Sequence, residues 1–149
     1  EEGKERFFLH FENEHHEIKA EFDYYVDVFY YKYFSLLDVL GNILKVKHDI
    51  ENIDATFLGT IKYLKDHSIA LDVCSCIAEV LNKYSSDCEF AHKLRTNITH
   101  NYSMNKLRFK TTKRDDQVEF HKAEYIPTKA IFTNIEVLVK IIPDILKCI

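Results

Sequence analysis

The chain has few of the residues that break helices or build tight turns. Its 149 residues include 3 glycines, 2 prolines, 1 methionine and no tryptophan. All-β domains need frequent turn residues, so this scarcity argues against a sandwich or barrel and favours long helices. The length corresponds to one domain that is large enough to bury a hydrophobic core. We therefore expect residues 1–149 to form a single helical domain.

Long apolar runs and an excess of positive charge are also missing. No run approaches the roughly 18 residues of a membrane-spanning helix, and no signal peptide is recognisable. The formal net charge is −4 at pH 7, so any affinity for nucleic acid must come from a local patch. We expect no membrane partner.

Cysteine and histidine are present, but not in the spacing of a metal site. The cysteines are too sparse for a disulfide framework and lack paired CxxC spacing. We expect buried free thiols and a cytoplasmic protein. These cysteines are Cys74, Cys76, Cys88 and Cys148. His15 and His16 are adjacent and point apart on a helix, so the sequence predicts no metal and no cofactor.

Apolar residues make up 46% of the chain and recur at helical spacing. The strongest stripe alternates steps of four and three residues, which predicts one long helix. It comprises Phe22, Val26, Phe29, Tyr33, Leu36, Leu40 and Ile43. A second set widens the apolar surface, so we expect this helix to be covered on more than one side. That set comprises Tyr25, Tyr30, Tyr31, Phe34, Leu37 and Leu44.

Three further helices are expected between residues 54 and 103. Asp54 is a candidate cap for the first of them, and residues 66–68 separate it from the next. Residues 86–89, Ser-Asp-Cys-Glu, have the form of a capping box and predict the start of the fourth helix of the chain.

The last helix is expected to start near Pro127, because proline suits the first helical turn. Pro143 should kink or end this helix, since proline lacks a backbone donor. Its expected core face comprises Ile131, Ile135, Leu138, Ile142 and Ile145.

The pattern between the fourth and the last helix is different. Apolar and basic residues alternate from Lys106 to Thr111, and residues 114–117 resemble a turn. Residues 104–126 therefore predict a short β-hairpin or an irregular insertion. The expected fold is an all-α, up-and-down bundle of about five helices with this insertion before the last.

The most specific chemistry lies in residues 95–102, in the C-terminal half of the fourth helix. Their sequence is Arg-Thr-Asn-Ile-Thr-His-Asn-Tyr. An arginine holds a phosphate with a planar fork of donors, and a histidine exchanges a proton near neutral pH. These groups suffice to cut RNA without a metal, because the 2′-hydroxyl of the substrate is itself the nucleophile. At 100° per residue, His100 lies about 140° around the helix from Arg95. One helix cannot easily close both around a phosphate, whereas two copies related by a two-fold axis can.

This spacing resembles the R-x4-6-H signature of HEPN domains (higher eukaryotes and prokaryotes nucleotide-binding), many of which are ribonucleases. The order of segments over roughly residues 20–103 is also similar: a long aromatic helix, two middle helices and the motif helix. The resemblance implies a homodimeric endoribonuclease in which Arg95 stabilises phosphoryl charge and His100 transfers the proton. Thr96 and Asn97 would orient the phosphate or the imidazole. The superfamily favours Asn, Asp or His directly after the arginine, where this chain has Thr96.

One toxin group of the superfamily carries R-x4-H-x-Y, which Arg95, His100 and Tyr102 match. In that group the tyrosine is adenylylated by a partner nucleotidyltransferase that acts as an antitoxin. The resemblance therefore implies a toxin–antitoxin or defence role, with Tyr102 as a candidate modification site. The plainer alternative is that Tyr102 packs, Arg95 pairs with an acidic residue and His100 lies at the surface.

Two further interpretations remain open. Lys106, Arg108 and Lys110 lie just beyond the motif, where they are positioned to track RNA phosphates or simply to solvate an edge strand. The chain is alternatively an inactive RNA-binding, nucleotide-binding or protein-interaction module, in which the aromatic residues 24–34 form an interface.

Overall fold

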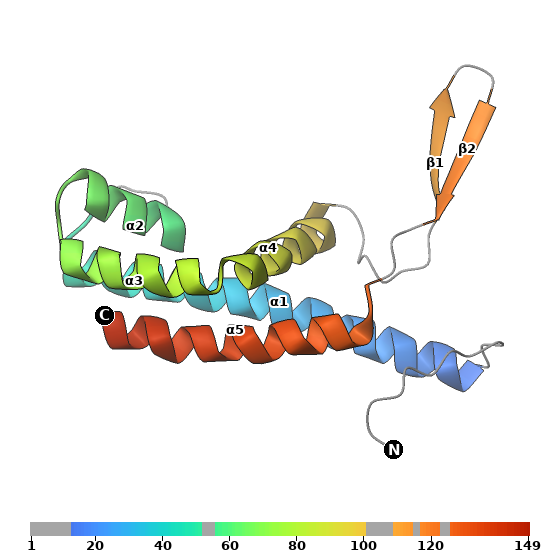
Figure 1. The fold of residues 1–149 in the computed structure, drawn as a ribbon, viewed down its shortest axis with the longest axis horizontal. Coiled ribbons are helices and arrows are strands. Elements are labelled where there is room, and N and C mark those ends of the chain that lie inside the picture. Colours follow the sequence, from blue (N-terminus) through green and yellow to red (C-terminus); the bar gives the residue numbers. More distant parts are fainter. Residues whose placement is uncertain (1–12, 52–55, 101–108, 115–116, 123–125) are drawn as a thin grey trace.

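The computed structural model describes residues 13–51, 56–100, 109–114, 117–122 and 126–149, with side chains for 15–51, 56–96 and 126–149. This part of the chain forms five helices and a two-stranded hairpin (Figure 1). The elements are α1 (Asn13–Lys47), α2 (Phe57–Asp66), α3 (Leu71–Lys83), α4 (Ser85–His100), β1 (Phe109–Arg114), β2 (Gln117–Lys122) and α5 (Thr128–Cys148). The predicted all-α bundle is confirmed.

The 35-residue helix α1 spans the molecule, and α5 runs beside it in the same direction (Figure 1). At the beginning of both helices the rings of Phe22 and Phe132 lie 5.7 Å apart, centre to centre. At the other end, Lys47 Nζ donates a 2.5 Å hydrogen bond to the carbonyl of Ile149. Helices α3 and α4 run in the opposite direction, so they pack antiparallel to α5 (Figure 1).

Helix α2 begins against the C-terminal third of α1, where two contacts define its start. Asp38 Oδ1 accepts a 3.2 Å hydrogen bond from the backbone N–H of Phe57. A Cβ atom added to Gly41 would lie 2.9 Å from the Cα of Phe57, so glycine allows this close approach. The helix is capped by Thr56, whose side chain accepts from the Gly59 N–H. The prediction of Asp54 as the cap was therefore wrong; a residue two positions later meets the free donor.

The core lies between α1, α5 and the shorter helices, and α1 contributes Val26, Tyr30, Tyr33, Leu40 and Leu44. The predicted stripe on α1 is partly correct, since three of its members are buried. Leu36 and Ile43 are instead 42% and 46% exposed, because α1 buries a face rotated toward Tyr30 and Leu44.

On α5 the prediction was right for Ile131, Leu138 and Ile145, which are fully buried. Asn134 and Ile141 complete that face, whereas Ile135 and Ile142 are only half-buried. The steps of three and four residues fit either set, so periodicity alone did not fix which side of α5 faces inward.

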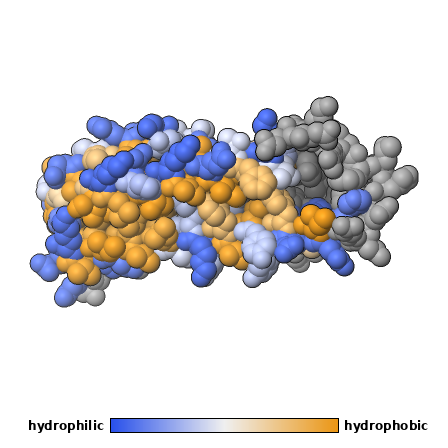
Figure 2. Space-filling model, turned by 90° about the horizontal axis from the view of Figure 1, so that it is seen from below, coloured by the Kyte–Doolittle hydropathy of each residue, from blue (hydrophilic) through white to orange (hydrophobic). Residues whose placement is uncertain are grey.

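A second apolar surface remains uncovered on the outside of α1 and α5, and we call it the outer apolar face. On α5 its exposed members recur every seven residues, so they lie on one side of the helix. Figure 2 shows apolar side chains gathered over a large part of this side of the molecule. The exposed members are Ile18, Tyr24, Tyr25, Val28, Tyr31, Leu36, Val39, Ile43, Val46, Phe132, Val139 and Leu146. The expectation that α1 is covered on more than one side is met in part: α2, α4 and α5 pack against it, while its outer side stays exposed.

Two of the four cysteines form a disulfide bond, so the prediction of four free thiols was wrong. Cys76 on α3 is bonded to Cys148 near the end of α5, with their Cα atoms 5.7 Å apart. These residues are 72 positions apart in the sequence, and only the antiparallel packing of α3 on α5 brings them together. Cys74 is a buried free thiol and Cys88 a half-buried one.

Two predicted helix boundaries also differ from the structure. Helix α4 begins at Ser85, which places Ser86 inside the first turn rather than at the cap. Helix α5 continues through Pro143 to Cys148, so of the two predicted effects of this proline, a kink or an end, the end is excluded. Pro143 and Val139, whose carbonyl loses its helical partner, are both exposed, so water can satisfy that carbonyl.

The predicted hairpin is confirmed. Strands β1 and β2 are antiparallel, with a register that runs from Phe109 opposite Lys122 to Arg114 opposite Gln117. In the described part of the chain, no helix is long and apolar enough to cross a membrane.

Candidate functional site

Arg95 lies where α4 packs on α1. Its guanidinium carbon is 5.2 Å from the centre of the Phe34 ring, and the side chain is half-buried. The His92 ring meets the same phenylalanine edge-on at 6.2 Å. An arginine above an aromatic face gains roughly 0.5–1 kcal/mol at such a site. Phe34 therefore holds the arginine in place while part of its side chain remains accessible.

The remaining residues of the predicted site are only partly within the described structure. Thr96 is exposed on α4. Asn97 lies in the last turn and His100 is the final residue of the helix, about 7.5 Å of helical rise from Arg95. The side chains of both lie outside the described residues. Arg95 and His100 thus lie on the same helix, as predicted, but the distance between their side chains is not defined.

Most of the expected RNA-binding and modification residues fall outside the part of the chain that the structure describes. Tyr102, Lys106 and Arg108 lie outside the described residues. Lys110 belongs to β1, where its backbone pairs with that of His121. Their assigned roles remain predictions.

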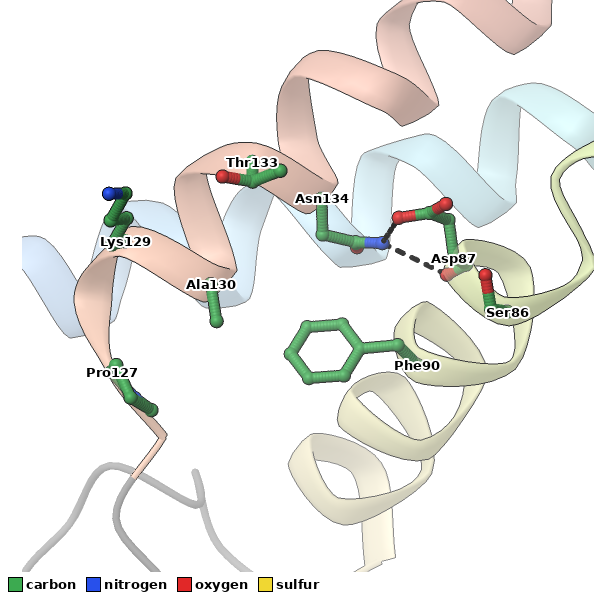
Figure 3. Close-up of a pocket in the computed structure, with 8 residues that line it drawn as sticks. All are labelled: Ser86, Asp87, Phe90, Pro127, Lys129, Ala130, Thr133 and Asn134. Atoms are coloured by element: carbon green, nitrogen blue, oxygen red, sulfur yellow. Dashed lines mark hydrogen bonds between the residues drawn. The ribbon is translucent and has the colours of Figure 1, made fainter.

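A solvent-open cavity of about 490 Å³ lies between the first half of α4 and the first half of α5 (Figure 3). Phe90, Ala130 and Pro127 form its apolar part. Ser86, Asp87, Lys129, Thr133 and Asn134 supply polar groups. The hollow is open to solvent and combines an apolar wall with a few polar groups, a combination that small ligands can use.

The polar wall of this cavity is fixed by a hydrogen-bond network that joins three helices. Asn134 Nδ2 donates to the Asp87 carbonyl at 3.0 Å and to Asp87 Oδ1 at 3.1 Å. The Tyr30 hydroxyl donates to Asn134 Oδ1 at 2.9 Å. Burial, and secondarily the charge of Asp87, raises the pKa of Tyr30 well above its ordinary value, so its hydroxyl remains a donor. Each partner therefore has a defined orientation.

Sequence reasoning missed Asn134 because it stands within an apolar helix. Its position between Ile131 and Leu138, at the spacing of the buried face, was the available signal. A buried amide must find hydrogen-bond partners, and Asn134 is only 3% exposed.

The two free thiols, Cys74 on α3 and Cys88 on α4, are both shielded from solvent to some degree. Burial, followed by the charge of Asp87, raises the pKa of the Cys88 thiol. Burial also raises the pKa of Cys74. Because the thiolate is the reactive form, the raised pKa values disfavour nucleophilic chemistry at either thiol.

Within the described residues, no group of three or more histidine, cysteine, aspartate or glutamate side chains is arranged to hold a metal ion.

Comparison with known proteins assigns the chain to a family. The family model HEPN_Cthe2314-like HEPN matches residues 1–149, the whole length of the chain. No curated protein and no solved structure matches it.

Proposed function

The chain belongs to the HEPN_Cthe2314-like HEPN family, and on that premise we propose that it is a metal-independent endoribonuclease. The family assignment supports a nuclease-like or nucleotide-binding module. The observation that carries the finer proposal is the anchored guanidinium of Arg95 on Phe34, five residues before a histidine at the end of the same helix. This supplies a positioned cation for a phosphate on the same helix as a group that can transfer protons.

The proposed reaction is transesterification within the RNA. His100 removes the proton from a ribose 2′-hydroxyl, and the 2′-oxygen attacks the adjacent phosphorus. The bond from phosphorus to the 5′-oxygen breaks, and this oxygen takes a proton from the histidine of a second copy. Arg95 stabilises the negative charge on the phosphoryl oxygens. The products are a 2′,3′-cyclic phosphate and a 5′-hydroxyl.

We propose that the site is composite and belongs to a homodimer. Arg95 and His100 lie about 140° apart around α4, so two copies are needed to surround one phosphate. The surface next to Arg95 supports this association. Tyr31 is exposed and lies on α1 one turn before Phe34, the residue that holds Arg95. A second copy that covers this tyrosine would lie beside the arginine.

The residues within and just beyond the motif complete the proposal. Thr96 and Asn97 orient the phosphate or the imidazole, and the local positive charges of Lys106, Arg108 and Lys110 contact the RNA backbone. Tyr102 is proposed as a modification site for a nucleotidyltransferase antitoxin, in a cytoplasmic toxin–antitoxin or defence setting.

The test is cleavage of mixed tRNA and mRNA in EDTA by the wild type, His100→Ala and His67→Ala. His67 is an exposed histidine at the end of α2 that stacks on Tyr63, so it controls for loss of a histidine. We expect cyclic-phosphate products from the wild type and His67→Ala, and none from His100→Ala. Equal cleavage by all three, or by none, would overturn the proposal.

A binding module without turnover is the second candidate. The outer apolar face favours it, because exposed apolar surface of this extent marks protein interaction sites. Thr96 also departs from the residues usual after the motif arginine. This candidate predicts RNA or protein binding that survives His100→Ala.

A further inference from the structure

The cavity between α4 and α5 combines one flat apolar surface with one oriented carboxylate. Figure 3 shows the Phe90 ring from α4 between the two helices, with Ala130 and Pro127 on the α5 side. Asp87 lies one turn before Phe90 on the same helix. A planar ring can therefore stack on Phe90 while its edge reaches Asp87.

The orientation of Asp87 restricts which ligand edge fits. Asn134 donates to the carbonyl and Oδ1 of Asp87, while its own carbonyl is occupied by Tyr30. Oδ2 and the second lone pair of Oδ1 can therefore accept hydrogen bonds from a ligand. A carboxylate only accepts hydrogen bonds, so the ligand edge must carry N–H donors.

From this geometry we propose that the cavity binds a nucleobase of the RNA, guanine in preference to the others. Bases stack on aromatic side chains and are recognised through their Watson–Crick edges. Guanine presents two adjacent N–H donors on that edge, which match the two oxygens of one carboxylate. Adenine and the pyrimidines do not present that pair.

The polar rim fits the rest of a nucleotide. Ser86 and Thr133 supply hydroxyls, and the exposed ammonium group of Lys129 lies where α5 begins, at the edge of the cavity. Phe90 precedes Arg95 by five residues, a rise of about 7.5 Å along α4. The two residues also lie about 140° apart around α4, so a base held here would belong to a different nucleotide from the one that Arg95 contacts. As a determinant of cleavage specificity, the inference rests on the proposed function.

The direct test is titration of the wild type with GMP, AMP, CMP and UMP, followed by NMR. We expect GMP to bind most tightly, with amide shifts concentrated in residues 86–90 and 127–134. Asp87→Asn should weaken GMP binding at least tenfold. Its side-chain oxygen still accepts from Asn134, so the fold is retained. The matched control is Glu89→Gln, which removes an exposed charge paired with Lys93 outside the cavity.

Phe90→Leu keeps an apolar side chain but removes the stacking surface, and it should also weaken GMP binding. No GMP binding by the wild type, equal affinity for all four nucleotides, or equal effects of Asp87→Asn and Glu89→Gln would overturn the inference. GMP binding without RNA cleavage would overturn the ribonuclease proposal but support the base site. If cleavage depends on His100 but its base preference is unchanged in Asp87→Asn, the ribonuclease proposal would be supported and the base site overturned.

Discussion

Tyr30 and Asn134 stand 104 positions apart in the sequence, yet the tyrosine hydroxyl donates a 2.9 Å hydrogen bond to the asparagine carbonyl in the core. Asn134 in turn donates twice to Asp87, so a single amide connects α1, α4 and α5. The same amide fixes the wall of the cavity, which links the stability of the bundle to the geometry of a candidate site.

Asn134→Ala should lower the free energy of unfolding by about 2–4 kcal/mol. The change leaves the Tyr30 hydroxyl without its buried partner, which costs about 1–3 kcal/mol, and it removes both hydrogen bonds from the amide to Asp87. Urea denaturation followed by circular dichroism measures the loss. Thr133→Ala, an exposed neighbour on α5, is the control and should shift stability by less than about 0.5 kcal/mol. Equal stability of the two variants would contradict a structural role for the amide.

Phe34→Leu should reduce RNA cleavage about two- to fivefold, because it removes the aromatic face beneath Arg95 while keeping an apolar residue. The matched control is Phe29→Leu, which alters a ring that stacks on Tyr33 rather than on the arginine. Both substitutions should cost similar stability. Single-turnover rates on one RNA substrate distinguish them, and equal rates would show that Phe34 does not position Arg95.

Reduction of the Cys76–Cys148 bond should destabilise the chain by about 2–4 kcal/mol. The bond closes a loop of 72 residues, and its loss restores chain entropy to the unfolded state. Thermal unfolding with and without dithiothreitol measures the effect. Cys76→Ala should melt at a lower temperature than the oxidised wild type, both with and without dithiothreitol. A wild type that melts at the same temperature with or without reductant would argue against the bond in solution.

The free energy of unfolding should decrease above pH 10, and part of this decrease should come from the ionisation of two buried tyrosines. Burial raises the folded-state pKa of Tyr30 and of Tyr33 above the ordinary value of 10.0. The unfolded chain therefore releases these protons first. The stability they provide is complete below pH 10 and declines as pH rises toward the folded-state pKa. Each contributes a slope of about 1.4 kcal/mol per pH unit.

Urea titrations between pH 9 and pH 11 measure that slope. Tyr33→Phe should remove one tyrosine's share, whereas Tyr31→Phe, at an exposed position on the same helix, should remove none. Identical slopes in the two variants would contradict the burial of the Tyr33 hydroxyl.

The sequence predicted the kinds of elements well because few features decide them. Scarce glycine and proline and the steps of three and four residues indicate helices, and alternation near Thr111 indicates the hairpin. Which helix face is buried depends on neighbours far away in the chain. Leu36 and Ile43 were therefore misplaced, because both α1 and α5 carry more apolar surface than one core can cover.

The site was predicted only as a motif on a helix. Arg95 could be identified from its spacing to His100, but the ring that holds it, Phe34, lies 61 positions earlier in the sequence. The disulfide was missed for the same reason, since the packing of α3 on α5 alone brings Cys76 to Cys148. Contacts between distant segments have no local signature.

The position of α5 beside α1 also determines when the core can close. Until residues 131–145 have left the ribosome, the inner side of α1 has no partner on that flank, although α2, α3 and α4 are already available. The hydrogen bond from Tyr30 to Asn134 and the disulfide bond between Cys76 and Cys148 likewise cannot form before α5 is present. The nascent chain must therefore keep the aromatic helix α1 soluble until α5 has been made. Apolar surface that is exposed in this interval is prone to aggregation, and the docking of α5 closes the core.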